Sequence, residues 1–437
     1  QNNLDREPDE DCLVANVWTP GLDDAKRPVM FWLHGGGFVS GSGSGIYYDG
    51  TNISRRGDVV LVSINHRLGA FGFLHLFDVD PNAASSINVG MLDIVLALEW
   101  VRDNIVRFGG DPDNVTIFGE SGGGRKVTSL LAMPIAQGLF RKAVIESGPA
   151  VFMNDRDAVQ RLAEMMLEEL GIEQDPLQSL QSLAPQKILE AQNAVIDKIG
   201  PNAEGLAQTF AAVADGELLP HHPFDPEGPA VSDDIPVMVG YNRTEATLWM
   251  GRDPDLLELD EAGLERRITE MRGDDAKRLI EIYRAANPDA TCSDLLAYIA
   301  TGQRRYPIDS IKIAERKSAR GRAPVFLYTL TWRTAASRGA LRTPHALEIP
   351  LVFDNIHNAE RFVRPAEEAQ PLADIMSDTW IHFARTGNPN HSGIPQWPAY
   401  SLEKRETMIF DLPPRVEHDF GSAERTAWEP VFYKNIE

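Results

Sequence analysis

Short apolar runs alternate with amphipathic patterns along much of this chain, and this alternation restricts its fold more than any other feature. Six runs rich in β-branched and aromatic residues predict buried strands, at residues 29–34, 58–65, 115–119, 142–148, 236–242 and 323–331. Between them, apolar residues recur at helical spacing in residues 89–109, 157–170 and 261–286. Because parallel strands are joined by helices that cover both faces of their sheet, the sequence predicts an α/β fold with a mostly parallel, helix-covered sheet.

Two long intervals, at about 150–230 and 250–320, are mostly helical in pattern. We interpret them as insertions that cap the sheet rather than as separate domains. Residues 1–437 are therefore predicted to form one decorated α/β domain, a size that α/β enzymes reach as a single unit.

The charge balance of the chain is acidic. It has 42 Lys and Arg residues against 64 Asp and Glu residues, a net charge of −22. This balance disfavours nucleic acid and anionic membrane surfaces, which both reward clustered positive charge. The sequence contains no apolar, uncharged run of about 18 residues, so no membrane-spanning helix is expected. A small molecule is the expected partner, and a monomer is the default assembly.

The two cysteines, Cys12 and Cys292, are too few for a disulfide framework and form no CxxC pair. A structural zinc site or a thioredoxin-like redox motif is therefore not expected. So low a cysteine count favours a reducing, cytoplasmic compartment.

Residues 113–131, DNVTIFGESGGGRKVTSLL, form a pattern of strand, sharp turn and helix. Within them, Gly119-Glu120-Ser121-Gly122-Gly123 fits the G-x-S-x-G pattern of a nucleophile elbow. A serine at such a turn has a strained backbone, and its neighbours pass so close to the adjacent strand and helix that side chains would collide. Ser121 is therefore the predicted nucleophile, at a helix N-terminus whose dipole favours developing negative charge.

A second glycine cluster precedes this turn. The apolar run at 29–34 leads directly into His34-Gly35-Gly36-Gly37, whose backbone N–H groups can bind an oxyanion. A flexible loop is the alternative interpretation. It is weakened because both motifs occur in one chain, in the order that α/β-hydrolases use.

These motifs belong to longer stretches that resemble the type-B carboxylesterase family, which includes bacterial p-nitrobenzyl esterases, animal carboxylesterases and cholinesterases. The stretches are EDCLVANVWTP (10–20), PVMFWLHGGGFVSGSG (28–43), GDVVLVSINHRLGAFGFL (57–74), NVGMLDIVLALEWVRDNI (88–105), the serine turn, GLFRKAVIESG (138–148), WIHFARTGNPN and PQWPAY. The resemblance covers nearly the whole chain and is greatest to the bacterial enzymes. It implies an α/β-hydrolase fold and the hydrolysis of carboxylic esters.

The resemblance also implies the partners of the serine. In the family, the acid is a glutamate shortly after a strand, and GYNRTEATLW (240–249) places it at Glu245. The base histidine lies about a hundred residues later, and TPHALEIPLVF (343–353) places it at His345. The order of Ser121, Glu245 and His345 agrees with the serine–acid–histidine order of the fold.

Other residues compete for these roles. Six histidines either precede the acid or follow the base without its matching context, namely His221, His222, His357, His382, His391 and His418. His34 is expected to hold the backbone of the glycine loop in shape. Glu348 or Asp354 could in principle replace Glu245 as the acid. Glu245 is preferred because it follows a strand end, and Glu348 is expected to have a structural role.

The expected reaction is that of a serine esterase with an acyl-enzyme intermediate. Ser121 attacks the ester carbonyl, His345 accepts and later returns the proton, and Glu245 orients the imidazole. The oxyanion is expected to bind the N–H groups of Gly36, Gly37 and Gly122. No metal or organic cofactor is needed, and the expected substrates are esters of small, fairly apolar acids and alcohols.

Several positions depart from the family pattern. Gly122 stands where many relatives have alanine, Ala246 replaces a glycine after the acid, and His66 stands where tyrosine is common. None of these changes removes a catalytic atom. Relatives usually carry several dozen residues before the EDCL stretch, whereas nine precede it here. We therefore expect the first segment of the family to be absent and Cys12 to be a free thiol.

Two further function classes stay open. A lipase would act on longer-chain esters at an interface, and chain-length dependence would distinguish it from a carboxylesterase. A non-catalytic binding module or an inactive truncated relative would bind esters without turning them over.

Overall fold

The computed structural model of the protein describes residues 9–200, 210–253 and 255–433. The chain forms two compact units. The first unit consists of Gln1–Gly45, Asp58–Ala143 and Ala150–Ser232, and the second of Ile46–Gly57, Val144–Pro149 and Asp233–Glu437. The assignment of one decorated domain to residues 1–437 stays a prediction.

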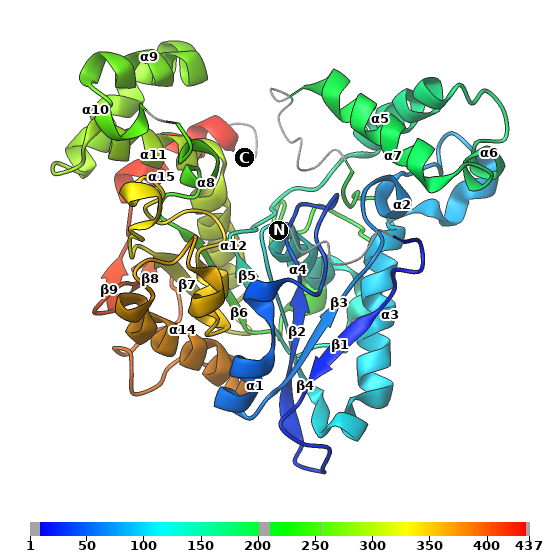
Figure 1. The fold of residues 1–437 in the computed structure, drawn as a ribbon, viewed down its shortest axis with the longest axis horizontal. Coiled ribbons are helices and arrows are strands. Elements are labelled where there is room, and N and C mark those ends of the chain that lie inside the picture. Colours follow the sequence, from blue (N-terminus) through cyan, green and yellow to red (C-terminus); the bar gives the residue numbers. More distant parts are fainter. Residues whose placement is uncertain (1–8, 201–209, 254, 434–437) are drawn as a thin grey trace. The chain divides into compact units, whose positions relative to one another are not determined.

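Among the described residues of the first unit, four strands lie side by side (Figure 1). Their order is β1 (Ala15–Trp18), β3 (Val60–Ile64), β2 (Arg27–Leu33) and β4 (Gly110–Glu120). Strand β2 is parallel to both β3 and β4, and β1 is antiparallel to β3. Leu33 pairs with Gly119, so the segments that follow β2 and β4 leave the sheet at the same edge. Ligands of open α/β sheets bind at this carboxyl edge.

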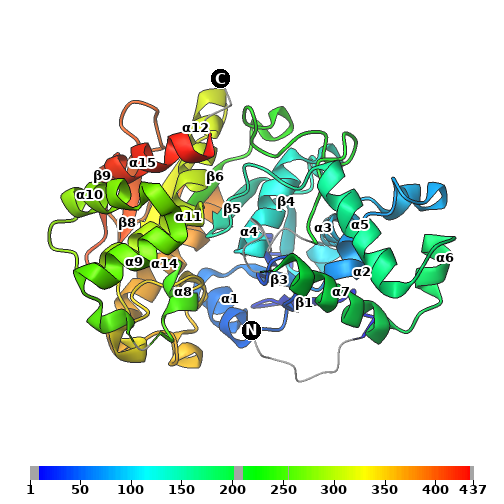
Figure 2. The ribbon, with the colours of Figure 1, turned by 90° about the horizontal axis from the view of Figure 1, so that it is seen from above.

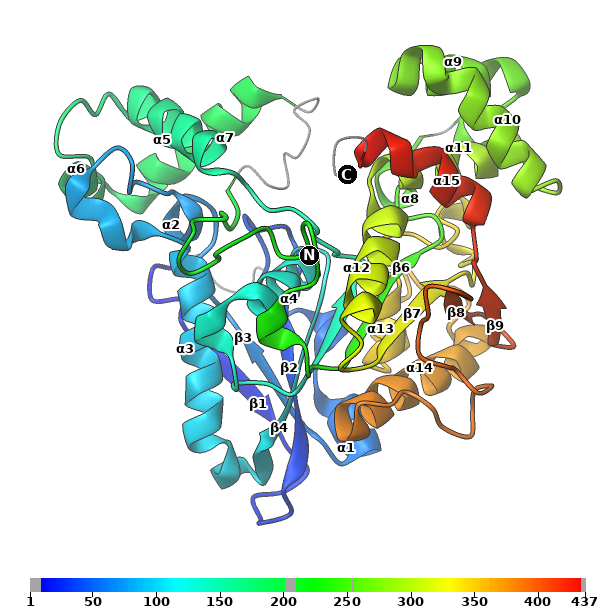
Figure 3. The same cartoon turned by 180° about the vertical axis from the view of Figure 1, so that it is seen from behind.

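The helices of the first unit follow its strands in the chain. They are α2 (Gly69–Phe73), α3 (Val89–Asn104), α4 (Gly122–Ala132), α5 (Arg156–Leu170), α6 (Pro176–Gln181) and α7 (Pro185–Ile199), with 3₁₀ turns at Pro81–Ser86, Ile105–Phe108, Pro134–Ala136 and Ala230–Ser232. Helices α5 and α7 pack together, and α7 packs against α2 (Figure 3). Much of the predicted insertion at 150–230 is therefore helical. Its residues 201–209 lie outside the described part of the chain.

Strand β5 (Lys142–Glu146) carries the chain from the first unit into the second. In the second unit, β6 (Val237–Asn242), β7 (Val325–Leu330) and β8 (Glu406–Phe410) are parallel and adjacent in that order. Strand β9 (Arg415–His418) is antiparallel to β8. The pairings in both units therefore confirm a mostly parallel sheet.

The second unit is rich in helices, several of which gather around α11 (Figure 2). They are α1 (Thr51–Gly57), α8 (Thr247–Met250), α9 (Glu261–Arg272), α10 (Ala276–Ala286), α11 (Cys292–Gln303), α12 (Tyr306–Arg320), α13 (Glu348–Val352), α14 (Ala366–Thr386) and α15 (Ser422–Phe432). Short 3₁₀ turns occur at Ile46–Tyr48, Leu256–Glu258, Gly273–Asp275, Ala336–Gly339 and Ile356–Ala359. The predicted insertion at 250–320 is mostly helical, and its residue 254 lies outside the described part.

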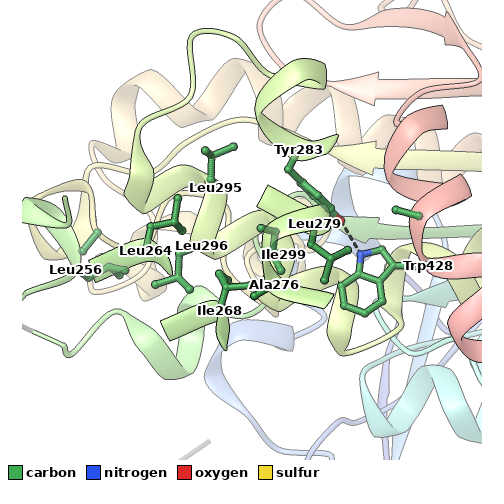
Figure 4. Close-up of a cluster of buried hydrophobic side chains, with 12 residues drawn as sticks. Leu256, Leu264, Ile268, Ala276, Leu279, Tyr283, Leu295, Leu296, Ile299 and Trp428 are labelled. Carbon is green, nitrogen blue, oxygen red and sulfur yellow. Dashed lines mark hydrogen bonds between the residues drawn. The ribbon is translucent and has the colours of Figure 1, made fainter. Parts of the chain in front are cut away.

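A buried apolar cluster joins α9, α10, α11 and α15 (Figure 4). It includes Leu264, Leu279 and Ile299, which are all fully buried. Trp428 of α15 closes one side, and its Nε1 donates a 2.8 Å hydrogen bond to the hydroxyl of Tyr283. Burial of this apolar surface stabilises the helical part of the second unit.

The predicted strands are all confirmed, and β4 begins at Gly110 rather than at residue 115. The predicted helix at 89–109 is α-helical as far as Asn104 and continues as a 3₁₀ turn. The prediction of a helix over the whole of 261–286 is wrong. Gly273 has a φ of 54° and ends α9, and α10 starts three residues later.

Candidate active site

The predicted nucleophile lies at a sharp turn between β4 and α4. Ser121 has a φ of 57° and a ψ of −120°, a conformation that non-glycine residues rarely adopt. A Cβ atom on Gly119 would lie 2.6 Å from the carbonyl oxygen of Leu33, and one on Gly123 would collide with the same oxygen. The turn therefore has the strain and the crowding that the sequence predicts for a nucleophile elbow.

The glycine loop follows β2 and lies against this turn. Gly36 and Gly37 have φ values of 92° and 64°, which favour glycine. A Cβ atom on Gly122 would collide with the carbonyl oxygen of Gly37, so the loop and the first residue of α4 are in close contact. Among the described residues, no acceptor takes a hydrogen bond from the N–H of Gly36 or Gly37. Gly122 begins α4, where N–H groups have no partner within the helix.

Each carbonyl of the loop is held by a hydrogen bond. The ring Nδ1 of His34 donates to the oxygen of Gly35 at 2.8 Å, and the N–H of Ser40 donates to the oxygen of Gly36 at 3.1 Å. This first contact agrees with the predicted role of His34 in shaping the loop. His66, which replaces a common tyrosine, stacks on the His34 ring with centroids 5.2 Å apart.

Sequence reasoning missed Lys126, which lies in α4 and is fully buried. Its Nζ donates to the carbonyl oxygens of His34 at 3.1 Å and Gly37 at 3.0 Å. Burial, together with the nearby positive charge of Lys126, lowers the pKa of His34 to about 3, so the imidazole is neutral. The sequence shows a lysine five residues after the candidate nucleophile, but nothing in the helical pattern around it indicates that this lysine is buried.

The predicted acid and base meet in the second unit. Glu245 follows β6, and its Oε2 lies 2.6 Å from Nδ1 of His345. Its Oε1 accepts a 2.7 Å hydrogen bond from the N–H of Asn242, and the N–H of His345 donates to its carbonyl oxygen at 3.2 Å. Both side chains are buried, and burial raises the pKa of Glu245 to about 8. This geometry fixes the imidazole with Nδ1 toward the carboxylate.

The two alternative acids have other partners. Glu348 is fully buried and accepts hydrogen bonds from the hydroxyl of Ser147 at 2.5 Å and from Nδ2 of Asn242. Burial and the nearby Glu245 raise the pKa of Glu348 to about 7. Asp354 accepts from Nε2 of Gln370 at 2.8 Å and lies 3.5 Å from Arg56. These contacts support the structural role predicted for Glu348.

The competing histidines make contacts away from Glu245. His382 and His391 stack on each other with centroids 5.4 Å apart, and His222 lies 3.2 Å from Asp155. His418 lies in β9, where it pairs with Glu406 of β8. Among the described residues, neither His221 nor His357 takes part in a ring stacking or an ion pair. Position 246 accommodates its alanine, because Ala246 has a φ of −60° and needs no glycine.

Two aromatic rings flank the imidazole of His345, and the sequence gave no indication of either. The ring of Tyr306 lies 5.0 Å from it and that of Trp249 lies 5.2 Å from it. The guanidinium of Arg304 packs on Trp249, 3.9 Å from the centroid of its ring. Trp249 is 46% exposed, so an apolar surface borders the base.

The predicted site residues are divided between the two units. Ser121, Gly36, Gly37 and Gly122 belong to the first, and Glu245 and His345 belong to the second. Within the described ranges, no three His, Cys, Asp or Glu side chains converge in a way that could hold a metal ion. No helix built from described residues has the length and apolarity to cross a bilayer. Cys12 and Cys292 are both free thiols.

Comparison with known proteins identifies the family. The model of the carboxylesterase family matches residues 1–428. The para-nitrobenzyl esterase of Bacillus subtilis (strain 168) is 36% identical over 427 residues, which cover 95% of this chain and 82% of the relative. The phenmedipham hydrolase of Pseudarthrobacter oxydans is 30% identical, with coverage of 92% and 79%.

Solved structures agree with this match. The carboxylesterase of Geobacillus stearothermophilus superimposes with a TM-score of 0.82 at 37% identity, covering 96% of this chain and 86% of that one. A thermophilic p-nitrobenzyl esterase gives a TM-score of 0.81 at 34% identity, with coverage of 96% and 84%. The chain belongs to the carboxylesterase family, and it is a carboxylic-ester hydrolase with the α/β-hydrolase fold.

Proposed function

We propose that this protein hydrolyses esters of small, fairly apolar acids and alcohols through an acyl-enzyme, with Ser121, His345 and Glu245 as its catalytic triad. The observation that carries the proposal is the 2.6 Å contact between His345 Nδ1 and Glu245 Oε2. A base held by a buried acid in this way can take a proton only through Nε2. The strained turn at Ser121 supports the same assignment.

In the first half of the reaction, Ser121 Oγ attacks the ester carbonyl while His345 Nε2 takes its proton. The imidazolium is stabilised by the carboxylate of Glu245. The C–O bond to the alcohol then breaks, and the same proton passes from His345 to the leaving oxygen. In the second half, water attacks the acyl-serine, giving its proton to His345, which returns it to Ser121 as the acid leaves.

The tetrahedral intermediate of each half carries a negative oxygen, which we assign to the N–H groups of Gly36, Gly37 and Gly122. Support comes from the contact between Gly122 and the carbonyl of Gly37, which places the loop against the helix N-terminus. Support also comes from the N–H groups of Gly36 and Gly37, which have no acceptor among the described residues. One such donor is worth on the order of 10²–10³ in turnover.

The preference for small, apolar esters rests on the rings beside the base. Tyr306 and Trp249 flank His345, which protonates the leaving alcohol, so they favour alcohols with an apolar or aromatic body. The name of one relative, a para-nitrobenzyl esterase, fits an aromatic alcohol group as well.

The test is hydrolysis of p-nitrophenyl acetate, butyrate and palmitate by this chain and by Ser121→Ala. Fast turnover of the short esters, lost by at least about 10⁴-fold in the variant, is the expected result. Faster turnover of palmitate would indicate a lipase instead. Equal, negligible rates from both folded proteins would indicate a binding module or an inactive relative.

We also propose that the protein acts as a cytoplasmic monomer. Its net charge of −22 opposes self-association, and its two free thiols suit a reducing compartment. Light scattering of the purified protein gives its molar mass, and fractionation of the source cells gives its compartment. A dimeric mass or a secreted protein would contradict the respective proposal.

A further inference from the structure

Lys126 is a fully buried cation five residues after the proposed nucleophile. Removing an ammonium group from water is strongly unfavourable unless hydrogen bonds compensate for the lost hydration. Burial accordingly lowers the pKa of Lys126 to about 7. An apolar side chain of similar length would fill this position without that penalty. The hydrogen bonds of the ammonium are therefore what distinguishes lysine from an apolar residue here.

Both carbonyl acceptors of Lys126 come from the glycine loop. Its Nζ donates to the oxygen of His34 at 3.1 Å and to that of Gly37 at 3.0 Å, the first and last residues of the motif. The ring of Phe38, the next residue, lies 5.2 Å from Nζ and adds a cation–π contact. A single ammonium on α4 therefore holds both ends of the loop.

The two peptide groups between these ends carry the proposed oxyanion donors. The N–H of Gly36 shares a peptide plane with the carbonyl of Gly35, and that of Gly37 with the carbonyl of Gly36. Those carbonyls are held by His34 Nδ1 and by the N–H of Ser40. Lys126 holds the carbonyls on either side. Together these bonds fix four successive peptide planes.

The position of Gly37 also explains a departure from the family pattern. Its carbonyl oxygen is bonded to Lys126 and lies where a Cβ atom on residue 122 would stand. Glycine at position 122 leaves room for this approach. The hydrogen bond from Lys126 to Gly37 therefore goes together with the lack of a side chain at Gly122, because both depend on the position of the same carbonyl oxygen.

We propose that Lys126 is a positioning residue for the oxyanion hole, because its two hydrogen bonds to the carbonyls of His34 and Gly37 hold the loop so that the N–H groups of Gly36 and Gly37 face the reacting oxygen. This inference rests on the proposed function, in which Ser121 is the nucleophile and these glycines are the oxyanion donors. Lys126 itself touches neither substrate nor reacting atoms in this account.

The test replaces Lys126 with methionine, which keeps the length of the side chain and removes its donors. The readouts are kcat and KM for p-nitrophenyl butyrate and the inhibition constant of an aryl trifluoromethyl ketone, whose serine adduct carries an oxyanion. We expect kcat to fall about 10²-fold and the inhibition constant to rise by a similar factor, with KM changed less than about threefold.

Lys142→Met is the matched control. Lys142 is also a buried lysine of the first unit, but it donates to the side chain of Asn114, far along β4 from Ser121. It is expected to lower thermal stability and leave kcat and the inhibition constant nearly unchanged. A loss of kcat in Lys126→Met no larger than that of the control would overturn the proposal, as would an unchanged inhibition constant.

Lys126→Gln keeps amide N–H donors and provides a rescue variant, which also decides the matter if the methionine variant does not fold. If both variants fold, kcat of Lys126→Gln should be at least about tenfold higher than that of Lys126→Met. If only Lys126→Gln folds, its kcat should stay within about tenfold of the wild type. A folded glutamine variant with about 10²-fold lower kcat and unchanged ketone inhibition would contradict the proposal. If Ser121→Ala retains full turnover, the proposed function fails instead, whatever Lys126 does.

Discussion

Nδ1 of His345 lies 2.6 Å from Oε2 of Glu245, and both side chains are buried in the second unit. This contact predicts the effect of Glu245→Gln. A glutamine can turn its amide N–H toward Nδ1 and so favour the tautomer in which Nε2 carries the proton. The variant should lose about 10⁴-fold in kcat while it keeps its fold, as judged by circular dichroism.

Glu146→Gln is the control for that substitution. Glu146 is equally buried, its Oε1 accepts a 2.7 Å hydrogen bond from Nε1 of Trp380, and burial holds its pKa well above the usual range. This hydrogen bond involves neither Glu245 nor His345, so Glu146→Gln leaves the contact between the proposed acid and base unchanged. Turnover within about tenfold of the wild type is expected. A similar loss of kcat in both variants would show that Glu245 is not the catalytic acid.

The pH dependence of the reaction provides a second prediction. Burial raises the pKa of Glu245 to about 8, and the N–H of Asn242 opposes this rise. Since the carboxylate form orients His345, kcat/KM should increase with pH and become constant above about pH 8. The profile for p-nitrophenyl acetate from about pH 5.5 to 9.5 checks this, and a flat profile above pH 6 would contradict it.

The close approach behind the serine turn predicts a third outcome. A Cβ atom on Gly123 would collide with the carbonyl oxygen of Leu33, so Gly123→Ala should lower the free energy of unfolding by about 3 kcal/mol or abolish folding. Gly171→Ala is the matched variant, because Gly171 has a φ of 66° but open space around it. It should be destabilising by only about 1 kcal/mol. Equal losses in urea titrations would show that crowding is not the cause.

Glu348 predicts a dependence of stability on pH. Burial raises its pKa from 4.5 to about 7, so between these values the folded state binds a proton that the unfolded state has released. The stability that this group contributes is complete below about pH 4.5 and is lost as the pH rises through about 7. Glu348→Gln removes the titration, so its stability relative to the wild type should rise between about pH 5 and 8, by roughly 3 kcal/mol at most.

Thermal midpoints measured at several pH values check this difference. Glu403→Gln, on an exposed residue, serves as the control and should show no such trend. A relative stability of Glu348→Gln that falls as the pH rises would reverse the expected sign and exclude the titration of Glu348 as its cause.

The serine turn could be predicted from the sequence because its constraints are mostly local. The strand, the glycines and the start of α4 all lie within residues 113–131, and the strained backbone of Ser121 follows from that short pattern. The pairing of Glu245 with His345 is different. It joins residues a hundred positions apart, and only the resemblance to a family, not any spacing, located it.

Features that depend on distant partners were not predicted. Strand β8 has only five residues, and β9 is short and charged, so neither has a clear strand pattern in the sequence. They are recognised as strands only because β8 pairs with β7 and β9 pairs with β8 in the structure. Lys126 is the clearest case at the site. Its helix is amphipathic in pattern, and a lysine there is expected in solvent until the loop at 34–37, about ninety residues earlier, is placed beside it.

The carbonyl oxygen of Gly37 occupies the space that a side chain at position 122 would need. We therefore expect the effects of substitutions at positions 122 and 126 to depend on each other. If Gly122 is replaced by alanine first, the loop must move while Lys126 still holds the carbonyl of Gly37. If Lys126 is replaced first, this carbonyl is released, and the later change to alanine disturbs the loop less. The backbone approach at Gly122 thus makes the order of mutations matter, which is epistasis with a visible structural cause.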